Sequence, residues 1–574
     1  MCAEKTESPR SPWRRLRILR ILGLSALPVL SLTASPGDPV DRADEIRRTL
    51  VVYNRSLEAS AQLARTYSAA RGIPEANLVG LETSKHETIS WQAYLDTIHN
   101  PLLERLIQAD WLTGSLAAAD AVHPNGKRQA VLFENRIAHL VLMKGLPMKV
   151  THDAVRGTDP SSEKNVNARR MGSWRGSIDS DLALLTQPEL DPAGASRNPL
   201  FNEAEPNGLM RQAIVRTARI DGPSFALCER LITRTLEAEK KGIRGRALID
   251  AGGPHAQGDR WLDLTRDKLA GLGFPLTYDD SRKRFGWGDP LDQVAWYFGW
   301  YANAAEGPFA DPVFSFAPGA IALHIHSFSA STIRLDTKAW VGPLLARGAS
   351  VAIGNVWEPY LGMTHRPHLL VDGLARGWSL GRAAWYSIPV TSWQGVVIGD
   401  PLYRPLAVPL DEQLESTADK ASRDPLAPYV TLRQMNRLAR SENPEERKQA
   451  RRLGERAFHT QPGIALGIAV AEHQLQAGDP EAARRQLAYL AHLPPPSVID
   501  LAQINRGARL LKEAGQPDAA LVVLLNTLDT RFPDRATAVA QFKRVIEAAR
   551  QQGRQRLARS LENRLTEEWP APED

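Results

Sequence analysis

The chain has 574 residues, of which 43% are hydrophobic and 24% charged, a composition typical of a globular protein rather than a disordered one. Its length predicts two or three domains, because single hydrophobic cores rarely grow so large. The net charge of +6 is a mild excess for this length and is concentrated near the N-terminus, so nucleic-acid binding is not expected.

The N-terminus has the residue order of a secretory signal. Arginines at positions 14, 15 and 17 precede an apolar run at 21–32, and small residues follow at 33–35. We therefore expect residues 1–35 to be a signal peptide and the protein to be exported, periplasmic or extracellular. The apolar run is short for a bilayer span, although an uncleaved anchor and a helix of the mature chain are alternative readings. No stable membrane span is expected apart from this segment.

Alternating strands and helices are predicted after the signal. Residues 50–54 and 77–81 have the pattern of strands, and they flank a helix over 56–71 that Gly72 closes. A second helix over 90–108 and a strand over 138–143 follow. Strand–helix–strand order with short connections predicts a mostly parallel sheet with helices on its faces.

Three nearly unbroken apolar runs, at 294–300, 320–326 and 349–354, are predicted to be central strands covered on both faces. They belong to an α/β region that we place at 46–410. This region has room for two subdomains, 46–215 and 216–410. A polar excursion rich in Gly, Pro and Asn, at 150–210, interrupts it and is expected to line a site.

The amino-acid composition changes after a linker that we place at 411–430. Ala, Leu, Arg and Glu dominate, and the sequence Ala-Gly-Asp-Pro-Glu-Ala-Ala at 477–483 recurs in related form at 514–520, a shift of 37 residues. This recurrence predicts an all-α region of tetratricopeptide-like hairpins over 431–567, with a plain helical bundle as the alternative. Such repeats present binding surfaces, so a protein or peptide partner is expected there.

Polar and aromatic side chains follow the three apolar runs, where the carboxyl ends of parallel strands would meet. His324 and His326 are two residues apart and would share one face of a strand, with Ser327 just beyond it. The candidate catalytic residues are Ser327, His326, His324 and Glu358. The candidate binding residues are Trp300, Tyr301, Asn303, Asn355, Trp357 and, from the polar excursion, Asp179.

The order of these segments resembles the gingipain/caspase-type cysteine peptidases. In that family one strand ends in Gly-His-Gly and the next in Ala-Cys, and a Gly-Ala-rich strand and a Gly-Asp-Pro sequence follow. The matching stretches here are 298–301, 325–327, 348–354 and 397–405. Trp300 stands where the family histidine would be, and Ser327 replaces the cysteine. Tryptophan cannot accept a proton, so the family dyad cannot operate as written.

A second resemblance covers about residues 47–410. The stretches 141–147, 176–182, 219–223, 324–330, 354–360 and 399–405 are similar to a family of exported proteins from bacteria that carry exosortase systems. That family has no assigned reaction, so this resemblance indicates relatives and not a chemistry.

Three functions remain open on these residues. The first is a hydrolase, with Ser327 as nucleophile and His326, His324 or Glu358 as its base. Adjacent residues on an extended chain point apart, so His326 and Ser327 can pair only if the strand breaks between them. A non-catalytic function is an equally favoured alternative to the hydrolase. In it the chain is a degenerate peptidase-like scaffold of a bacterial surface or export system, with an aromatic cleft.

Metal binding is the second function, through His324 and His326 with a carboxylate from Asp179, Asp181 or Glu358. Zinc or another divalent ion would suit such a set. Zinc held by cysteines is excluded, because only Cys2 and Cys228 are present. Otherwise no cofactor is expected, since no phosphate-binding or dinucleotide-binding glycine motif follows the first strand.

Overall fold

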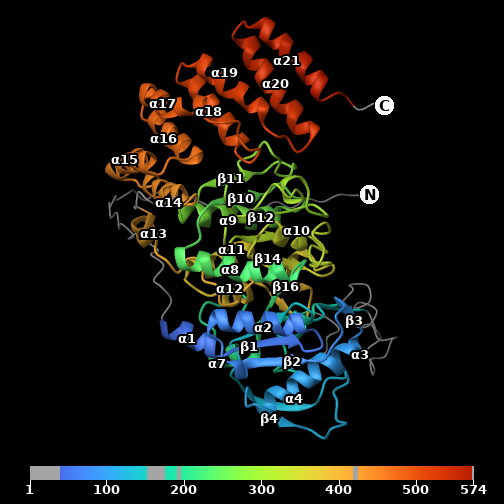
Figure 1. Cartoon of the computed structure of the whole chain (residues 1–574). Helices are drawn as coiled ribbons and strands as arrows, with labels where there is room; N and C mark the ends of the chain where they lie inside the picture. The colour runs from blue at the N-terminus through green and yellow to red at the C-terminus, as the bar shows by residue number, and fades with distance from the viewer. Residues whose placement is uncertain (1–38, 152–174, 191–194, 418–423, 572–574) are drawn as a thin grey trace, which may run out of the picture. The chain divides into compact units, whose positions relative to one another are not determined.

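The computed structural model describes residues 39–151, 175–190, 195–417 and 424–571 (Figure 1). The predicted signal peptide at 1–35 lies outside the described residues, and so does the middle of the polar excursion. None of the helices in the described ranges is long and apolar enough to cross a membrane.

The α/β region is built on one sheet of ten strands. The spatial order is β11-β10-β12-β13-β14-β16-β9-β6-β1-β2, and every neighbouring pair is parallel except β14 and β16. The predicted α/β class with a mostly parallel sheet is therefore confirmed. The strands are β1 (Thr49–Asn54), β2 (Leu78–Leu81), β6 (His139–Met143), β9 (Arg216–Ile220), β10 (Arg246–Asp250), β11 (Leu276–Asp279), β12 (Val294–Gly299), β13 (Ile321–His324), β14 (Val351–Asn355) and β16 (Gly395–Ile398).

The sheet consists of two halves with the same strand order. In the first half the order is β2-β1-β6-β9, and in the second it is β11-β10-β12-β13, which is the same 2-1-3-4 arrangement when each set is counted along the chain. Because β14 and β16 join the halves antiparallel, the carboxyl ends of the two halves lie at opposite edges of the sheet. The strands of the two halves therefore point in opposite directions.

The halves differ from the predicted subdomains 46–215 and 216–410. Strand β9 comes at the start of the second range but pairs with β6 of the first half, and β16 also lies beside β9. The reason is that the chain returns to the first half after completing the second, a pairing that local sequence patterns do not reveal.

Helices cover both faces, which explains why β12 and β13 are buried along their whole length and are apolar except for His324 at the end of β13. Apolar side chains from one face of the sheet share a core with α2 (Glu58–Arg71), α8 (Phe225–Lys241) and α10 (Val341–Ala346). The other face packs on α4 (Asn100–Gln108), α9 (Ala256–Gly271), α11 (Pro367–Ala375) and α12 (Leu380–Ser387). Gly72 closes α2 with φ of 69°, the left-handed conformation that glycine adopts at little cost.

The C-terminal region is helical, as predicted. Its helices are α14 (Ala427–Ala439), α15 (Pro444–Thr460), α16 (Ile464–Gln476), α17 (Pro480–Leu487), α18 (Leu501–Glu513), α19 (Pro517–Asn526), α20 (Arg535–Gln551) and α21 (Gln555–Glu568). Gly478, Gly515 and Gly553 have φ of 77°, 74° and 68° and turn the chain between the last three helix pairs. The repeated Ala-Gly of the sequence is this turn.

Part of the predicted linker at 411–430 is helical instead. Helix α13 (Leu410–Thr417) covers its beginning, and α14 starts at Ala427. Leu410 and Gln413 are buried, and the Gln413 side chain donates to the carbonyl of Val408 at 2.9 Å. The described parts of this segment, 411–417 and 424–430, therefore belong largely to helices that pack on the rest of the chain.

Candidate functional site at the strand tips

The three apolar runs form adjacent strands whose tips meet. The amide of Ile325 donates to the carbonyl of Gly299 at 2.8 Å, and the amide of Ala330 donates to the carbonyl of Asn355 at 2.9 Å. The rings of Tyr301 and His326 have centroids 4.4 Å apart. We call the residues gathered here the strand-tip site. It comprises Tyr301, His326, Ser327, Asn355, Trp357 and Glu358, together with Lys149, Arg175 and Gln394 from three other segments of the α/β region.

His324 is a core residue and not a base or a metal ligand. Its Nδ1 lies 2.9 Å from the hydroxyl of Tyr297, and its Nε2 accepts the amide N–H of Ala302 at 3.2 Å. The ring also stacks on Trp340 with centroids 3.6 Å apart. Burial holds the pKa of His324 well below its ordinary value, with His326 and Arg284 adding to the effect. Both nitrogens are therefore occupied, and the predicted pair with His326 does not form.

His326 does not activate Ser327. Its Nδ1 lies 2.5 Å from the backbone carbonyl of Ser327, so this nitrogen carries a proton and donates it. The hydroxyl of Ser327 has no hydrogen-bond partner among the residues that the structure describes. Burial lowers the pKa of His326, opposed by the Ser327 carbonyl and by the charge of Glu358. Glu358 accepts the amide N–H of Tyr360 at 3.1 Å and hydrogen-bonds neither histidine.

Two of the predicted binding residues have other places. Trp300 is buried, and its indole N–H donates to Asp259 at 2.8 Å, so its side chain belongs to the core. Asn303 is exposed, and no hydrogen bond of its side chain occurs within the described ranges. Of the aromatic residues predicted to line this edge, Tyr301 and Trp357 remain in the site.

Asp179 also lies elsewhere, because it serves a buried ion-pair network of the first half. Its carboxylate binds Arg219 through two hydrogen bonds of 3.1 and 2.7 Å, and Arg219 also donates to Asp221 at 3.2 Å. Burial alone would lower the pKa of Arg219, but the charges and hydrogen bonds of Asp179 and Asp221 outweigh it and raise that pKa above its ordinary value. Within the described residues, no three of the side chains that usually ligate metals come together in a metal-binding arrangement.

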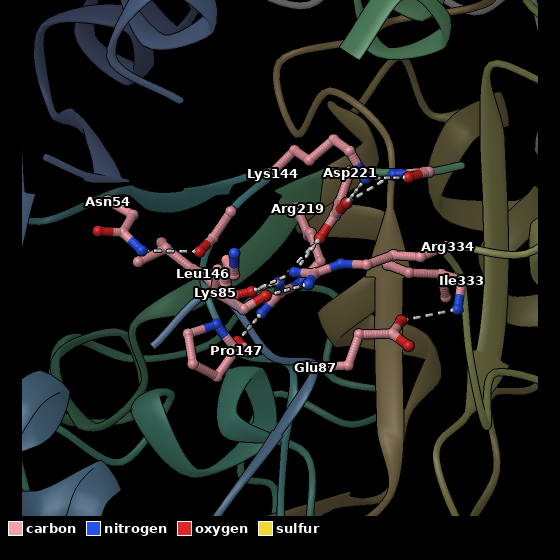
Figure 2. Close-up of polar contacts among 12 residues, drawn as sticks. Asn54, Lys85, Glu87, Lys144, Leu146, Pro147, Arg219, Asp221, Ile333 and Arg334 are labelled. Atoms are coloured by element: carbon pink, nitrogen blue, oxygen red, sulfur yellow. Dashed lines mark hydrogen bonds and ion pairs between the residues drawn. The ribbon is translucent and has the colours of Figure 1, made fainter. Parts of the chain in front are cut away.

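The same network fastens the segment that follows the β13 tip to the first half of the sheet (Figure 2). Arg334 donates to the carbonyl of Leu146 at 2.8 Å and lies 3.5 Å from Asp221. Glu87 accepts the hydroxyl of Thr332 at 2.7 Å and the amide of Ile333 at 3.0 Å. Contacts from three segments, at Glu87, Leu146 and Asp221, thus hold the loop that carries His326 and Ser327.

Sequence reasoning missed the cations of the site. The Lys149 ammonium lies 4.2 Å, and the Arg175 guanidinium 5.3 Å, from the centroid of the Trp357 ring. Lys149 is 7% exposed and donates to the carbonyl of Ser331, and burial lowers its pKa. Within the described residues neither cation has a carboxylate at ion-pair distance. Nothing in the sequence around Lys149 indicates that its side chain is buried beside an aromatic ring from a distant segment.

Three buried polar atoms of the site have no hydrogen-bond partner among the described residues. They are the Oδ1 of Asn355, the Nε1 of Trp357 and the Oε1 of Gln394. The Nε2 of Gln394 donates to the carbonyl of Arg175 at 2.5 Å, which fixes the amide so that its oxygen is the unpaired atom. Buried polar atoms without partners are costly, so this arrangement favours an occupant that both donates and accepts hydrogen bonds.

Comparison with known proteins adds little to this geometry. No model of a protein family matches the chain, and no curated protein matches it. Among solved structures, a chain described as "Structure of Protease" is similar at 12% identity, over 63% of this chain and 78% of that one, with a TM-score of 0.32. A similarity at that TM-score carries no argument about fold or function.

Proposed function

We propose that this chain is an exported, non-catalytic binding protein with a caspase/gingipain-like α/β region and a tetratricopeptide-like C-terminal region. It would act as a scaffold of a bacterial surface or export system, with a second protein or peptide partner on the C-terminal helices. The signal-like order of residues 1–35 supports export. The neighbouring strands β12, β13 and β14 and the recurring helix turns at Gly478 and Gly515 support the two fold assignments.

The observation that carries the non-catalytic proposal is the state of the two histidines. A serine hydroxyl attacks a substrate only when a base takes its proton. Both nitrogens of His324 are occupied and the Nδ1 of His326 donates to a carbonyl. Within the described residues no hydrogen bond joins the hydroxyl of Ser327 to the Nε2 of His326 or to Glu358. Ser327 therefore lacks the activation that hydrolysis requires.

The ligand class follows from the charges of the strand-tip site. Lys149 is a buried ammonium whose hydrogen-bond partner is a carbonyl, and Arg175 is exposed next to it over the same ring. An incoming carboxylate would neutralise both, and charge-assisted hydrogen bonds are stronger than neutral ones. The unpaired amide oxygens of Asn355 and Gln394 suit peptide N–H groups. The site therefore favours an acidic peptide.

A fluorophosphonate probe tests the absence of catalysis. We expect the full chain to be labelled no more than its Ser327→Ala variant, by in-gel fluorescence. Labelling that depends on Ser327 would show an activated nucleophile and would overturn the non-catalytic proposal.

Peptide binding tests the ligand class, with fluorescein-labelled Leu-Asp-Glu-Leu-Asp and its Asn/Gln counterpart as anisotropy probes. The acidic probe should bind the full chain more tightly than the Asn/Gln probe. Lys149→Gln should weaken the binding of the acidic probe about tenfold or more, because the carboxylate of the bound peptide loses its cationic partner. The exposed Lys240 provides the control, since Lys240→Gln makes the same chemical change far along α8. Equal binding of the two probes, or an unchanged affinity in Lys149→Gln, would refute an acidic ligand at this site.

A further inference from the structure

A pocket of about 650 Å³ lies apart from the strand-tip site. Asp292 and Gln293, which precede β12, form one side, and the beginnings of α14, α16 and α18 form the others. This volume is within the range of pockets that bind small molecules. The pocket therefore has room for a ligand of several residues or for a comparable small molecule.

The charged residues that line this pocket are all acidic. They are Asp292, Asp424 and Asp500, and no lysine, arginine or histidine of the described chain lines it. Asp292 is neutralised from outside the pocket by Arg246, through hydrogen bonds of 3.2 and 3.0 Å. Asp424 is likewise bound by Arg244 at 2.7 Å.

Asp500 is the acid that has no cation. Its carboxylate accepts the hydroxyl of Ser497 at 2.7 Å, and no basic side chain of the described residues forms an ion pair with it. Burial raises its pKa, and the charge of Asp292 contributes in the same direction. A cation entering the pocket would remove this electrostatic cost.

Two buried amide oxygens point to the same ligand chemistry. Gln503 is 2% exposed and Gln461 is 9% exposed, and both line the pocket. The Nε2 of Gln503 donates to the carboxylate of Asp292 at 3.0 Å, and the Nε2 of Gln461 donates to the carbonyl of Thr417. Because carboxylates and carbonyls only accept, each amide is fixed with its oxygen unpaired. The two buried side-chain atoms of this pocket that lack a partner are thus both acceptors.

The remaining wall is apolar. It includes Pro425, Pro428, Pro462, Ile464 and Ile499. Apolar walls with a few placed polar groups are the usual form of a ligand site, and here the polar groups select hydrogen-bond donors and positive charge.

We propose that this pocket binds an alkylammonium or guanidinium group on an apolar stem, supplied by a basic peptide segment. Asp500 receives the charge, and the amide oxygens of Gln461 and Gln503 accept its N–H groups. The proline and isoleucine side chains hold the stem. This site is independent of the strand-tip site and takes ligands of the opposite charge.

Anisotropy titrations of the full chain test this inference. The probes are fluorescein-labelled Pro-Leu-Lys-Arg-Leu-Pro and its acidic counterpart Pro-Leu-Glu-Glu-Leu-Pro, with cadaverine as a competitor. We expect the basic probe to bind and the acidic probe not to compete. Asp500→Asn should weaken the basic probe about tenfold, as loss of one partner of a desolvated charge pair does. Displacement by cadaverine only at much higher concentration would support a peptide, and displacement at equal concentration would overturn the peptide as the preferred source.

The matched control is Glu513→Gln, which removes an exposed acid from the last turn of α18. It should bind the basic probe as the parent does. Asn can replace Asp500 without a change of shape, so the thermal unfolding of Asp500→Asn should match that of the parent. Unchanged affinity in folded Asp500→Asn, or equal losses in both variants, would refute the site.

Discussion

Asp250 shows how strongly burial changes a single residue in this protein. It ends β10, is fully buried, and lies 3.2 Å from the guanidinium of Arg284. Burial raises its pKa to about 8; Arg284 opposes this shift and Asp279 adds to it. The native carboxyl group therefore keeps its proton at pH values where an unfolded chain, with a pKa of about 4, has released it.

This difference predicts a pH dependence of stability. Between pH 4 and 8 the native state binds one more proton at Asp250 than the unfolded state, so the contribution of Asp250 to stability falls as pH rises, by up to about 1.4 kcal/mol per pH unit. Asp250→Asn has no such proton to lose. Urea unfolding at pH 5, 6, 7 and 8 should show the variant gaining on the parent toward pH 8. Asp336→Asn, at an exposed position, should show no trend, and a difference for Asp250→Asn that is constant with pH would contradict the assignment.

The motif at 176–182 illustrates why polar residues in a recognised stretch need not be catalytic. Ser177 caps α6 (Ile178–Leu182), and the hydroxyl of Ser180 accepts the amide N–H of Trp393 at 3.0 Å. Asp181 pairs with the buried ammonium of Lys127 at 2.9 Å and accepts the hydroxyl of Tyr94 at 2.6 Å. Ser177 thus stabilises the start of α6, and Ser180 and Asp181 join α6 to other segments, so the structure explains these polar residues.

At the scale of elements, helix α9 lies very close to the tip of β12. A Cβ atom at Gly258 would come within 2.1 Å of the Trp300 ring, and one at Gly253 within 2.0 Å. The glycines therefore provide the space in which Trp300 is buried. This close approach removes Trp300 from the surface and leaves Tyr301 to face His326.

Two alanine substitutions on the same helix should have opposite effects. Gly258→Ala places a methyl group against Trp300 and should lower the free energy of unfolding by about 1–3 kcal/mol, as overpacking does. Gly271→Ala has open space around its Cβ and should raise the free energy of unfolding by about 0.4–1 kcal/mol. Urea unfolding measures both. A loss of stability in Gly258→Ala no larger than that in Gly271→Ala would contradict the close packing.

At the scale of the whole molecule, Asp292 joins the α/β region to the C-terminal helices. It binds Arg246 at the start of β10, Tyr429 of α14 and Gln503 of α18. Three segments far apart in the chain thus share one buried carboxylate, which couples the two regions energetically.

Removing this charge should destabilise both regions. Asp292→Asn leaves the buried guanidinium of Arg246 without its counter-charge and should cost about 3–5 kcal/mol. Calorimetry should show unfolding of both the sheet and the helices at lower temperature. The double variant Arg246→Met with Asp292→Asn should recover part of the loss, because the uncompensated charge is gone. Unfolding of the C-terminal helices at the parental temperature in Asp292→Asn would show that the regions are not coupled.

Local patterns in the sequence were sufficient for most elements of the fold. The apolar runs at 294–300, 320–326 and 349–354 became the neighbouring strands β12, β13 and β14, because strands covered on both faces leave no room for polar residues. Helix α2 and its closing Gly72 followed from helical spacing and glycine's tolerance of positive φ. These features depend on residues near one another in the chain.

The return of the chain to the first half through β16, and the partners of polar side chains, were decided only by the tertiary structure. His324 proved to be a core residue because Tyr297, Ala302 and Trp340 surround it, and Lys149 became a site residue because Trp357 lies beneath it. Periodicity tells which residues are buried, since burial depends on the average character of a face. It does not tell which buried polar groups meet, because hydrogen bonds and ion pairs require particular atoms from distant segments within about 3 Å of each other.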